Sequence, residues 1–253
     1  MKILVFIAGV SDPKWPVRAT DRAMPSIRPD QIVLSPFDEA ALELALQIRD
    51  ANPATQIIVK VAGGPDGETL ARKVAASNPD EIALLPAGDD WNLEASAHML
   101  ASQVEGAELV VIGREFGDCD PGCVAAQMAA RLGRPIFFDT QFVEQTENEI
   151  RFGREREDCI ERLAFLDPLV ISTTNDERLR LRKPLMKNVM MSRKRDIPFS
   201  PFGANDMISC DDIELVGVGE LLNGRNEAQC EFLRGDLSEQ ARKLADVISG
   251  HMT

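Results

Sequence analysis

One glycine-containing segment of the sequence lies where a phosphate-binding loop would be expected, after a predicted strand and before a predicted helix. Gly113, Asp118, Asp120 and Gly122 lie between an apolar run typical of a buried strand and a stretch with helical periodicity. Backbone N–H groups at a helix start attract anions, so this segment could hold a phosphate without a dedicated side chain. The alternative is an ordinary connection between a strand and a helix, since the common phosphate-loop and dinucleotide fingerprints are absent.

The cysteines and histidines do not indicate nucleophilic or metal-dependent catalysis. The five cysteines are odd in number and scattered, which is typical of reduced thiols in a cytoplasmic protein. Cys119 and Cys123 lie four residues apart, but no second Cys or His pair follows at zinc spacing, so no metal site is expected. Neither His98 nor His251 has a nucleophile motif nearby. We therefore expect a protein without catalytic residues of its own.

A strongly basic segment, residues 178–195, is the second feature with functional chemistry. It contains eight Lys or Arg side chains and no acidic one, together with Leu185, Met186, Met190 and Met191. A run of charge is ordinarily only a solvated face, whereas methionine side chains adapt to varied partners, so a docking surface is the functional alternative. Because its periodicity is weak, we expect the segment to be a long surface loop.

The first two-thirds of the chain alternate between short apolar runs and helical patterns. Runs without internal alternation are typical of strands in a parallel sheet covered on both faces, and they occur at 2–8, 56–62, 81–85 and 108–113. One helix begins with Ser35 as a candidate N-cap, followed by proline and two acidic residues. Further helices are expected at 67–77, 92–103 and 122–132. This order predicts an α/β three-layer sandwich with a mainly parallel sheet.

Ligands of such sheets bind beyond the carboxyl ends of the strands. Residues 6–12, 62–65 and 113–124 each follow a predicted strand, so we expect them to converge at one edge.

The pattern changes after Pro135. Residues 137–144, 149–155 and 158–165 predict antiparallel strands with polar exposed faces, and 168–172 predict a last buried strand. Pro198, Pro201 and Gly203 indicate a linker, and residues 237–248 a terminal amphipathic helix. We therefore expect an α/β domain over residues 1–197 and a C-terminal linker and helix over residues 198–253.

Composition excludes several function classes. The chain has 28 Lys and Arg against 41 Asp and Glu, with a formal net charge of −13. Nucleic acids and anionic membrane surfaces would be repelled by most of such a molecule. No apolar stretch approaches the ~18 residues of a transmembrane helix. With 44% hydrophobic residues the chain is also too apolar for a disordered protein.

Five motifs in register resemble the electron-transfer flavoprotein β subunits. The segment S-P-F-D-E-A-A-L-E at 35–43 is similar to the family's N-P-F-D-E-x-A-x-E. The opening 1–18, with Asp12-Pro13 and Pro16-Val17-Arg18, and the Gly64-Pro65 unit with Glu68-Thr69-Leu70 also match. Residues 113–135 resemble the nucleotide loop, and 182–195 resemble the partner-recognition loop. The likeness covers about residues 1–197.

This resemblance implies an adenine-nucleotide α-hydrolase-like fold and a non-catalytic role in a heterodimer. In the family, FAD is held mainly by the α subunit, and the β subunit buries an AMP of structural role. The loop at 174–196 would dock a dehydrogenase, and electrons would pass to a quinone-linked acceptor. The C-terminal helix would pack on the α subunit.

The family's contact residues carry over by position. Pro13 and Phe37 would lie near the flavin edge. The AMP contacts would be Phe6, Ser35, Pro36, Phe37, Asp38, Gly63, Gly113, Arg114, Asp118, Asp120, Gly122, Cys123 and Val124. The docking residues would be Arg182, Met186, Lys187, Met190, Arg193, Lys194 and Arg195, with Met186 at the position of the usual leucine anchor.

The chain departs from the family pattern at the nucleotide loop. The family's N-Q-T-G is replaced by Gly122-Cys123-Val124-Ala125, which removes polar groups that bind phosphate. AMP, a second FAD as in the electron-bifurcating branch, or no nucleotide therefore stay open. Two other functions are weighed on the same fold. A stand-alone adenine-nucleotide-binding regulator remains an alternative, whereas ATP-dependent chemistry would need an S-G-G-x-D-S loop that residues 8–12 do not supply.

Overall fold

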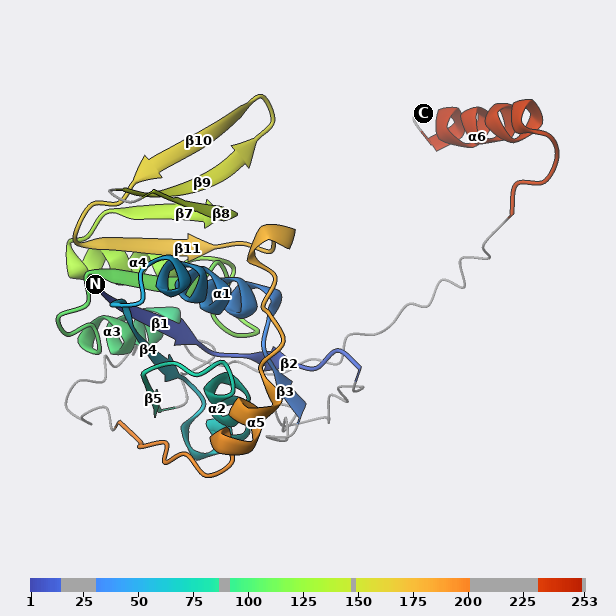
Figure 1. Ribbon diagram of the computed structural model, residues 1–253. Coiled ribbons are helices and arrows are strands. Elements are labelled where there is room, and N and C mark those ends of the chain that lie inside the picture. Colours follow the sequence, from blue (N-terminus) through green and yellow to red (C-terminus); the bar gives the residue numbers. More distant parts are fainter. Residues whose placement is uncertain (15–30, 87–91, 147–148, 201–231, 252–253) are drawn as a thin grey trace. The chain divides into compact units, whose positions relative to one another are not determined.

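A parallel sheet forms the centre of the first of two units into which the chain divides, Met1–Val216 and Gly217–Thr253. The computed structural model (Figure 1) describes residues 1–14, 31–86, 92–146, 149–200 and 232–251. The sheet has the strand order β5-β4-β1-β6-β11-β7, and every neighbouring pair is parallel. Its strands are β1 (Lys2–Ile7), β4 (Gln56–Val61), β5 (Glu81–Leu84), β6 (Leu109–Gly113), β7 (Ile136–Thr140) and β11 (Leu169–Thr173).

Helices cover both faces of this sheet. Successive side chains of a strand point to opposite faces, so Ile3, Val5 and Ile7 join one apolar cluster while Leu4 and Phe6 join another. The first cluster is completed by helices α1 (Pro36–Ala51) and α2 (Glu68–Ala75), and the second by α3 (Leu93–Ser102) and α4 (Val124–Leu132). The α/β three-layer fold predicted from the sequence is confirmed.

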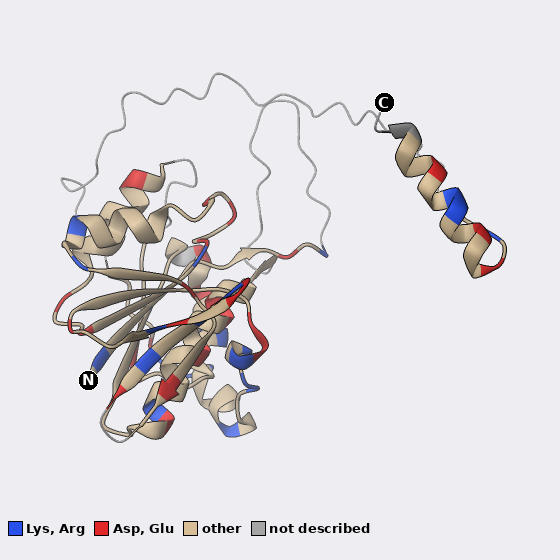
Figure 2. Cartoon of the chain, turned by 90° about the horizontal axis from the view of Figure 1, so that it is seen from above, with Lys and Arg blue, Asp and Glu red and all other residues tan. Residues whose placement is uncertain are grey.

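A separate antiparallel sheet lies on the α1 side. It consists of β8 (Phe142–Gln145), β9 (Ile150–Arg156) and β10 (Cys159–Ala164) in the order β10-β9-β8. Phe152 is fully buried and anchors it in the α1 cluster. The sheet's surface carries charges of both signs (Figure 2), with Arg162 donating to Glu144 at 2.9 Å between Nε and Oε2.

One predicted antiparallel strand, residues 137–144, is divided between the two sheets. The first part belongs to β7, which pairs in parallel with β11, and the second part is β8. Phe137 pairs with Ile171 and Thr140 with Thr173, so β7 holds one extra residue between these pairs. Asp139 has a positive φ of 54° there. A β-bulge bends the strand and ends its pairing, which explains why the run changes sheets.

The basic segment is also more ordered than the expected surface loop. It contains a 3₁₀ turn, η3 (Glu177–Leu179), and a helix, α5 (Met186–Ser192). A helix this short is marginal by itself, so packing must support it; α5 packs against α2. Three further elements were not predicted: the strands β2 (Val10–Ser11) and β3 (Ile32–Val33), which form a small antiparallel ribbon, and the 3₁₀ turn η2 (Gly64–Gly67).

Unit 2 contains one described helix, α6 (Leu237–His251), three residues longer than the predicted 237–248. The resemblance motif Pro16-Val17-Arg18 and the linker residues Pro201 and Gly203 lie outside the described residues. The expected domain boundary after residue 197 stays a prediction, because the division after Val216 also falls outside them.

Among the helices that the structure describes, none combines the length and the apolar character needed to cross a bilayer. The same part of the chain contains no group of three or more His, Cys, Asp or Glu residues arranged to hold a metal ion.

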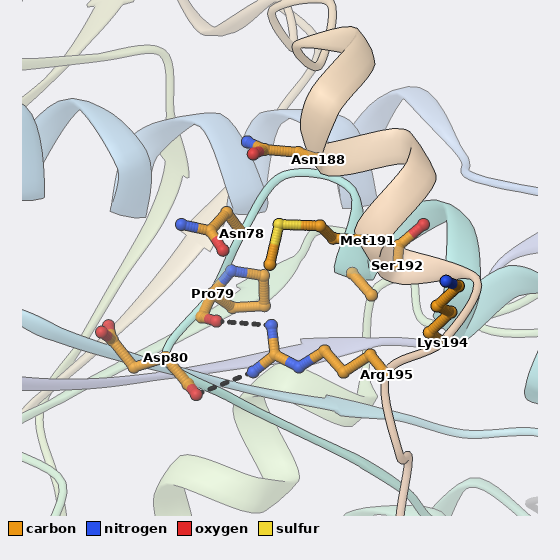
Figure 3. A pocket seen from close by; sticks show the side chains of 9 residues that line it. Asn78, Pro79, Asp80, Asn188, Met191, Ser192, Lys194 and Arg195 are labelled. Atoms are coloured by element: carbon orange, nitrogen blue, oxygen red, sulfur yellow. Dashed lines mark hydrogen bonds between the residues drawn. The ribbon is translucent and has the colours of Figure 1, made fainter.

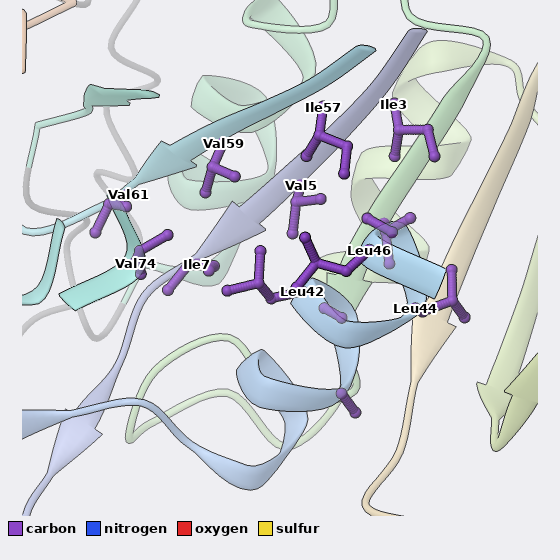
Figure 4. Packing of buried hydrophobic residues seen from close by; sticks show 14 of the residues in the cluster. Ile3, Val5, Ile7, Leu42, Leu44, Leu46, Ile57, Val59, Val61 and Val74 are labelled. Atoms are coloured by element: carbon purple, nitrogen blue, oxygen red, sulfur yellow. The ribbon is translucent and has the colours of Figure 1, made fainter. Parts of the chain in front are cut away.

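The packing between α1 and β1 gives a first prediction. Leu42 is fully buried and points from α1 toward the sheet (Figure 4). Leu42→Ala should lower the free energy of unfolding by about 3 kcal/mol, because it removes apolar contacts and leaves a cavity. Urea denaturation measures the change. Leu185→Ala is the matched control, since that leucine is 70% exposed and its loss should cost under ~0.5 kcal/mol. Equal effects of the two substitutions would contradict this packing.

Candidate functional site

A buried carboxylate joins the end of β1 to the start of α1. Asp38 Oδ2 accepts hydrogen bonds from the backbone N–H groups of Gly9 at 3.0 Å and Ser35 at 3.1 Å, and Oδ1 accepts from Ala8 at 3.4 Å. Ser35 Oγ accepts from the Asp38 N–H at 2.9 Å, which completes a capping box. The predicted N-cap at Ser35 is confirmed. The cap also orders the chain that leaves β1.

Asp38 is 1% exposed, and its burial raises the pKa of its carboxyl from 3.8 to about 6. Hydrogen bonds from Ser35, Gly9 and Ala8 favour the ionised form and partly oppose this effect. The neighbouring Glu39 also has a raised pKa, because it is partly buried, and the charge of Arg180 acts in the opposite direction.

Gly113, Phe37 and Thr173 bring β6, α1 and β11 together at the same edge. A Cβ atom on Gly113 would lie 2.9 Å from Phe37 Cβ, so glycine is required for this close approach. Thr173 Oγ1 donates to the Phe37 carbonyl at 3.1 Å, and the Arg114 N–H donates to the Thr173 carbonyl at 2.8 Å. The Arg114 guanidinium lies 4.8 Å from the centre of the Phe37 ring. Phe37 is thereby held by β6, by β11 and by Arg114 in the loop after β6.

The start of α4 is occupied by a carboxylate from the chain itself. Asp120 Oδ1 accepts from the N–H groups of Gly122 at 2.9 Å, Cys123 at 2.7 Å and Val124 at 3.2 Å. Its Oδ2 accepts from Phe116 at 2.9 Å, and the side chain is only 4% exposed. These are the donors expected from the sequence to hold a phosphate. In this arrangement, a phosphate would first have to displace the Asp120 carboxylate.

The other residues that were predicted to contact the nucleotide or the flavin are either buried in the core or accessible at the surface. Phe6 and Val124 have no exposed surface, so their side chains belong to the core between the sheet and α4. Pro13, Pro36, Arg114 and Asp118 are exposed, and Gly63 is half-buried just beyond β4.

Sequence reasoning missed one residue of this edge. Thr173 is the last residue of β11 and directly follows the predicted strand 168–172, and that position was the available signal. Ser11 donates to Asp118 Oδ2 through both its N–H, at 3.0 Å, and its Oγ, at 2.6 Å. Ser11 and Asp118 belong to the segments 6–12 and 113–124, and this contact confirms the prediction that the two segments meet at this edge.

The residues that position α5 form the second part of the site. Arg72 of α2 donates from Nη1 to the carbonyl oxygens of Ser192 and Arg193, both at 3.1 Å, and of Arg195 at 3.3 Å. These carbonyls follow the C-terminal end of a helix, where unpaired acceptors attract a cation. Arg72 therefore fixes α5 to α2, and sequence reasoning missed it.

Two of the predicted docking cations are engaged within the chain. Arg182 forms an ion pair with Glu43 of α1, 2.7 Å between Nη2 and Oε1, and another with Asp50. Arg195 donates to the carbonyl oxygens of Pro79 at 2.8 Å and Asp80 at 2.7 Å. Both arginines position the segment, and their direct contact with a partner stays a prediction.

The face of α5 that is left uncovered is apolar with cationic flanks. Leu185 is 70% exposed, Met186 75%, Met190 64% and Met191 61%. The side chains of Lys187, Arg193 and Lys194 are exposed, and none of the described residues accepts a hydrogen bond or ion pair from them. Such large apolar side chains on a fixed helix are typical of a protein interaction site.

Comparison with known proteins links these features to one family. The model of the family described as "Electron transfer flavoprotein domain" matches residues 28–198. The chain is 26% identical to the electron transfer flavoprotein subunit beta of Dictyostelium discoideum, over 87% of this chain and 89% of that protein. It is 30% identical to the protein of that name in Mycobacterium bovis, over 74% and 73% of the two chains.

A third relative is named "Caffeyl-CoA reductase-Etf complex subunit CarD", from Acetobacterium woodii. The chain is 30% identical to it, and the match covers 57% of each protein.

The buried carboxyl of Asp38 gives a pH prediction. Its folded pKa of about 6 lies above the unfolded value of 3.8, so its contribution to stability is fully present below pH 3.8 and is lost as pH rises through 6. The free energy of unfolding should therefore fall by up to roughly 3 kcal/mol across this window. Denaturation of Asp38→Asn, which cannot ionise, should show a flatter pH dependence. Glu39→Gln should keep most of the slope; an unchanged slope in Asp38→Asn would contradict the assignment.

Proposed function

The chain belongs to the electron transfer flavoprotein family, as a relative of its β subunits, and we propose that it is the β subunit of a heterodimer that carries electrons from a dehydrogenase to a quinone-linked acceptor. In this proposal the chain is an electron carrier and not an enzyme. The α subunit holds most of the FAD, and the heterodimer works in the cytoplasm.

The exposed face of α5 is the observation that carries the proposal. Arg72, Arg182 and Arg195 fix the segment by hydrogen bonds and ion pairs. A fixed helix loses little conformational entropy on docking, so Met186 and Met190 can anchor a dehydrogenase efficiently. Lys187, Arg193 and Lys194 would orient the partner by charge.

The C-terminal helix supports a second contact, with the α subunit. Leu237, Leu244, Val247 and Ile248 of α6 are between 49% and 87% exposed, although they are the apolar residues of an amphipathic helix. We propose that the α subunit covers this apolar face, so that α6 joins the two chains.

Phe37 and Pro13 are proposed to face the flavin. FAD, when bound, would supply the group that accepts and releases electrons. The chain's own part is to hold Phe37 in place, through the Thr173 hydroxyl and the close approach at Gly113. The stack of Arg114 on Phe37 further limits movement of that ring.

The residues of the α4 start do not fit an AMP phosphate as they stand. Their N–H donors are engaged by Asp120, and Val124 offers no hydroxyl. We therefore assign no functional step to AMP. The similarity to CarD favours a second candidate, in which this chain is a subunit of a larger reductase–Etf complex. If that complex belongs to the electron-bifurcating branch, the resemblance implies a second FAD in this chain.

Cofactor content tests the proposed function. The chain should be co-expressed with an α-type subunit encoded beside it, and the purified complex extracted so that FAD and AMP are counted per heterodimer. We expect one FAD and no AMP, because the phosphate donors are taken. Two FAD molecules would favour the second candidate, and one AMP would show that Asp120 moves aside. A colourless monomer that binds ATP would replace the proposal with a stand-alone regulator.

Docking through α5 gives a separate prediction. Met186→Ala should lower kcat/KM for electron transfer from the donor dehydrogenase about tenfold, as expected for an interface anchor, with FAD content unchanged. The donor is selected by stopped-flow reduction of the heterodimer with purified acyl-CoA and amine dehydrogenases. Leu166→Ala is the control, because Leu166 is 59% exposed and lies outside the basic segment. Equal transfer rates for the two variants would reject docking through α5.

A further inference from the structure

A cavity of about 590 Å³ lies between α5 and the loop that connects α2 to β5. Figure 3 shows Asn188, Met191 and Lys194 on its helix side, opposite Asn78, Pro79 and Asp80. The cavity lies beside the Met186 and Met190 face but does not include those two side chains.

The loop side of the cavity has no free backbone acceptor among its three residues. Arg49 Nη1 donates to the Asn78 carbonyl at 2.8 Å, and Arg195 donates to the carbonyls of Pro79 and Asp80. Asn78 itself has a left-handed φ of 57°, which turns the chain at this point. Two guanidinium groups thus hold three successive carbonyls of the loop in place.

The one acidic residue that lines the cavity is already compensated. Asp80 Oδ2 accepts from the Ile57 N–H at 2.8 Å and lies 3.5 Å from Arg49 Nη1. Its charge is therefore matched, and it would repel an incoming carboxylate less than a free aspartate would.

The helix side presents a cation, an amide and an adaptable apolar chain. Lys194 is exposed, and no described residue accepts a hydrogen bond from its ammonium group. Asn188 offers an amide, and Met191 is 61% exposed. A smaller cavity of about 300 Å³ on another side of α5 is lined by Arg72, Lys73 and Arg193 and by no acidic residue. Lys194 in the larger hollow and Arg193 in the smaller one are therefore the cations that no described residue engages.

We propose that the cavity between α5 and the α2–β5 loop receives an acidic segment of the electron-donating partner, with an apolar side chain packed on Met191 and a carboxylate at Lys194. This inference rests on the proposed function, because the partner is the donor that docks on α5. It adds a pocket in this chain to the apolar anchor that α5 presents outward. Attraction between opposite charges would set the orientation of docking, and contact with Met191 would add affinity.

The test uses a defined probe and the methionine side chains. The full chain is labelled with ¹³C at its methionine methyl groups and studied in the heterodimer, or alone where none forms. The probe is a blocked tetrapeptide of Glu, Leu, Asp and Glu, and its control has Gln and Asn in place of the acids. We expect the acidic peptide to shift the Met191 methyl signal and leave Met186 unchanged, with at least fivefold weaker binding of the neutral peptide.

Two charge-reversal variants distinguish binding in the cavity from attraction by the overall positive charge of the basic segment. Lys194→Glu should weaken binding of the acidic peptide about fivefold, because it removes an ion pair and adds repulsion. Lys183→Glu makes the same change in the same segment but at a residue that lines neither hollow, so it should have a smaller effect. Equal effects of the two variants, equal binding of the two peptides, or an equal shift of Met191 by inorganic phosphate alone would overturn the proposal.

The outcome is distinguishable from a failure of the proposed function. If Met186→Ala slows transfer but Met191 does not respond to the peptide, docking on α5 stands and the cavity is not its acidic subsite. If Met191 responds and Lys194→Glu does not slow transfer from the donor, the cavity binds acidic peptides but not this partner, and the inference is rejected.

Discussion

The edge of the sheet depends on one constraint: where strands end and helices begin, backbone N–H groups need hydrogen-bond acceptors. Asp38 and Asp120 meet this need, and each carboxylate accepts three or more such groups while almost fully buried. An unpaired buried donor costs free energy comparable to a lost hydrogen bond, so both helix starts require these acids. The same bonds fix where Phe37 and the loop of 114–123 lie. The hydrogen bonds of Asp38 and Asp120 thus order the loops at this edge, and those of Asp120 also occupy the donors that a phosphate would need.

Arginine plays the corresponding role around α5. Arg72, Arg182 and Arg195 use their several donors on carbonyls and carboxylates of distant elements. A guanidinium can make such bonds in a fixed geometry, whereas a lysine is a flexible point charge. Arginine and lysine side chains of the basic segment therefore have different roles. These arginines hold the helix, and Lys187 and Lys194 remain available to a partner together with the methionines.

Much of the fold was predictable from the sequence because it depends on local patterns. Apolar runs located the strands, and Ser35 with its following proline located α1. The prediction failed where tertiary contacts outweigh local pattern. Helix α5 has seven residues, too few to show a period, and depends on Arg72, more than a hundred residues earlier. The bulge at Asp139 moved a strand between sheets, although the run of 137–144 looks continuous.

The sequence by itself determined the α/β class, the family resemblance and the set of side chains near the sheet edge, since these follow from periodicity and motif. Only the tertiary structure decided which of those groups are still free. Asp120 could have faced a ligand, and Arg182 a partner, on sequence grounds alone. Their actual partners are set by folding, because acceptors such as Glu43 lie 139 residues away from Arg182 in the chain. A hydrogen-bonding group has few partners, and those inside the protein compete with any outside it.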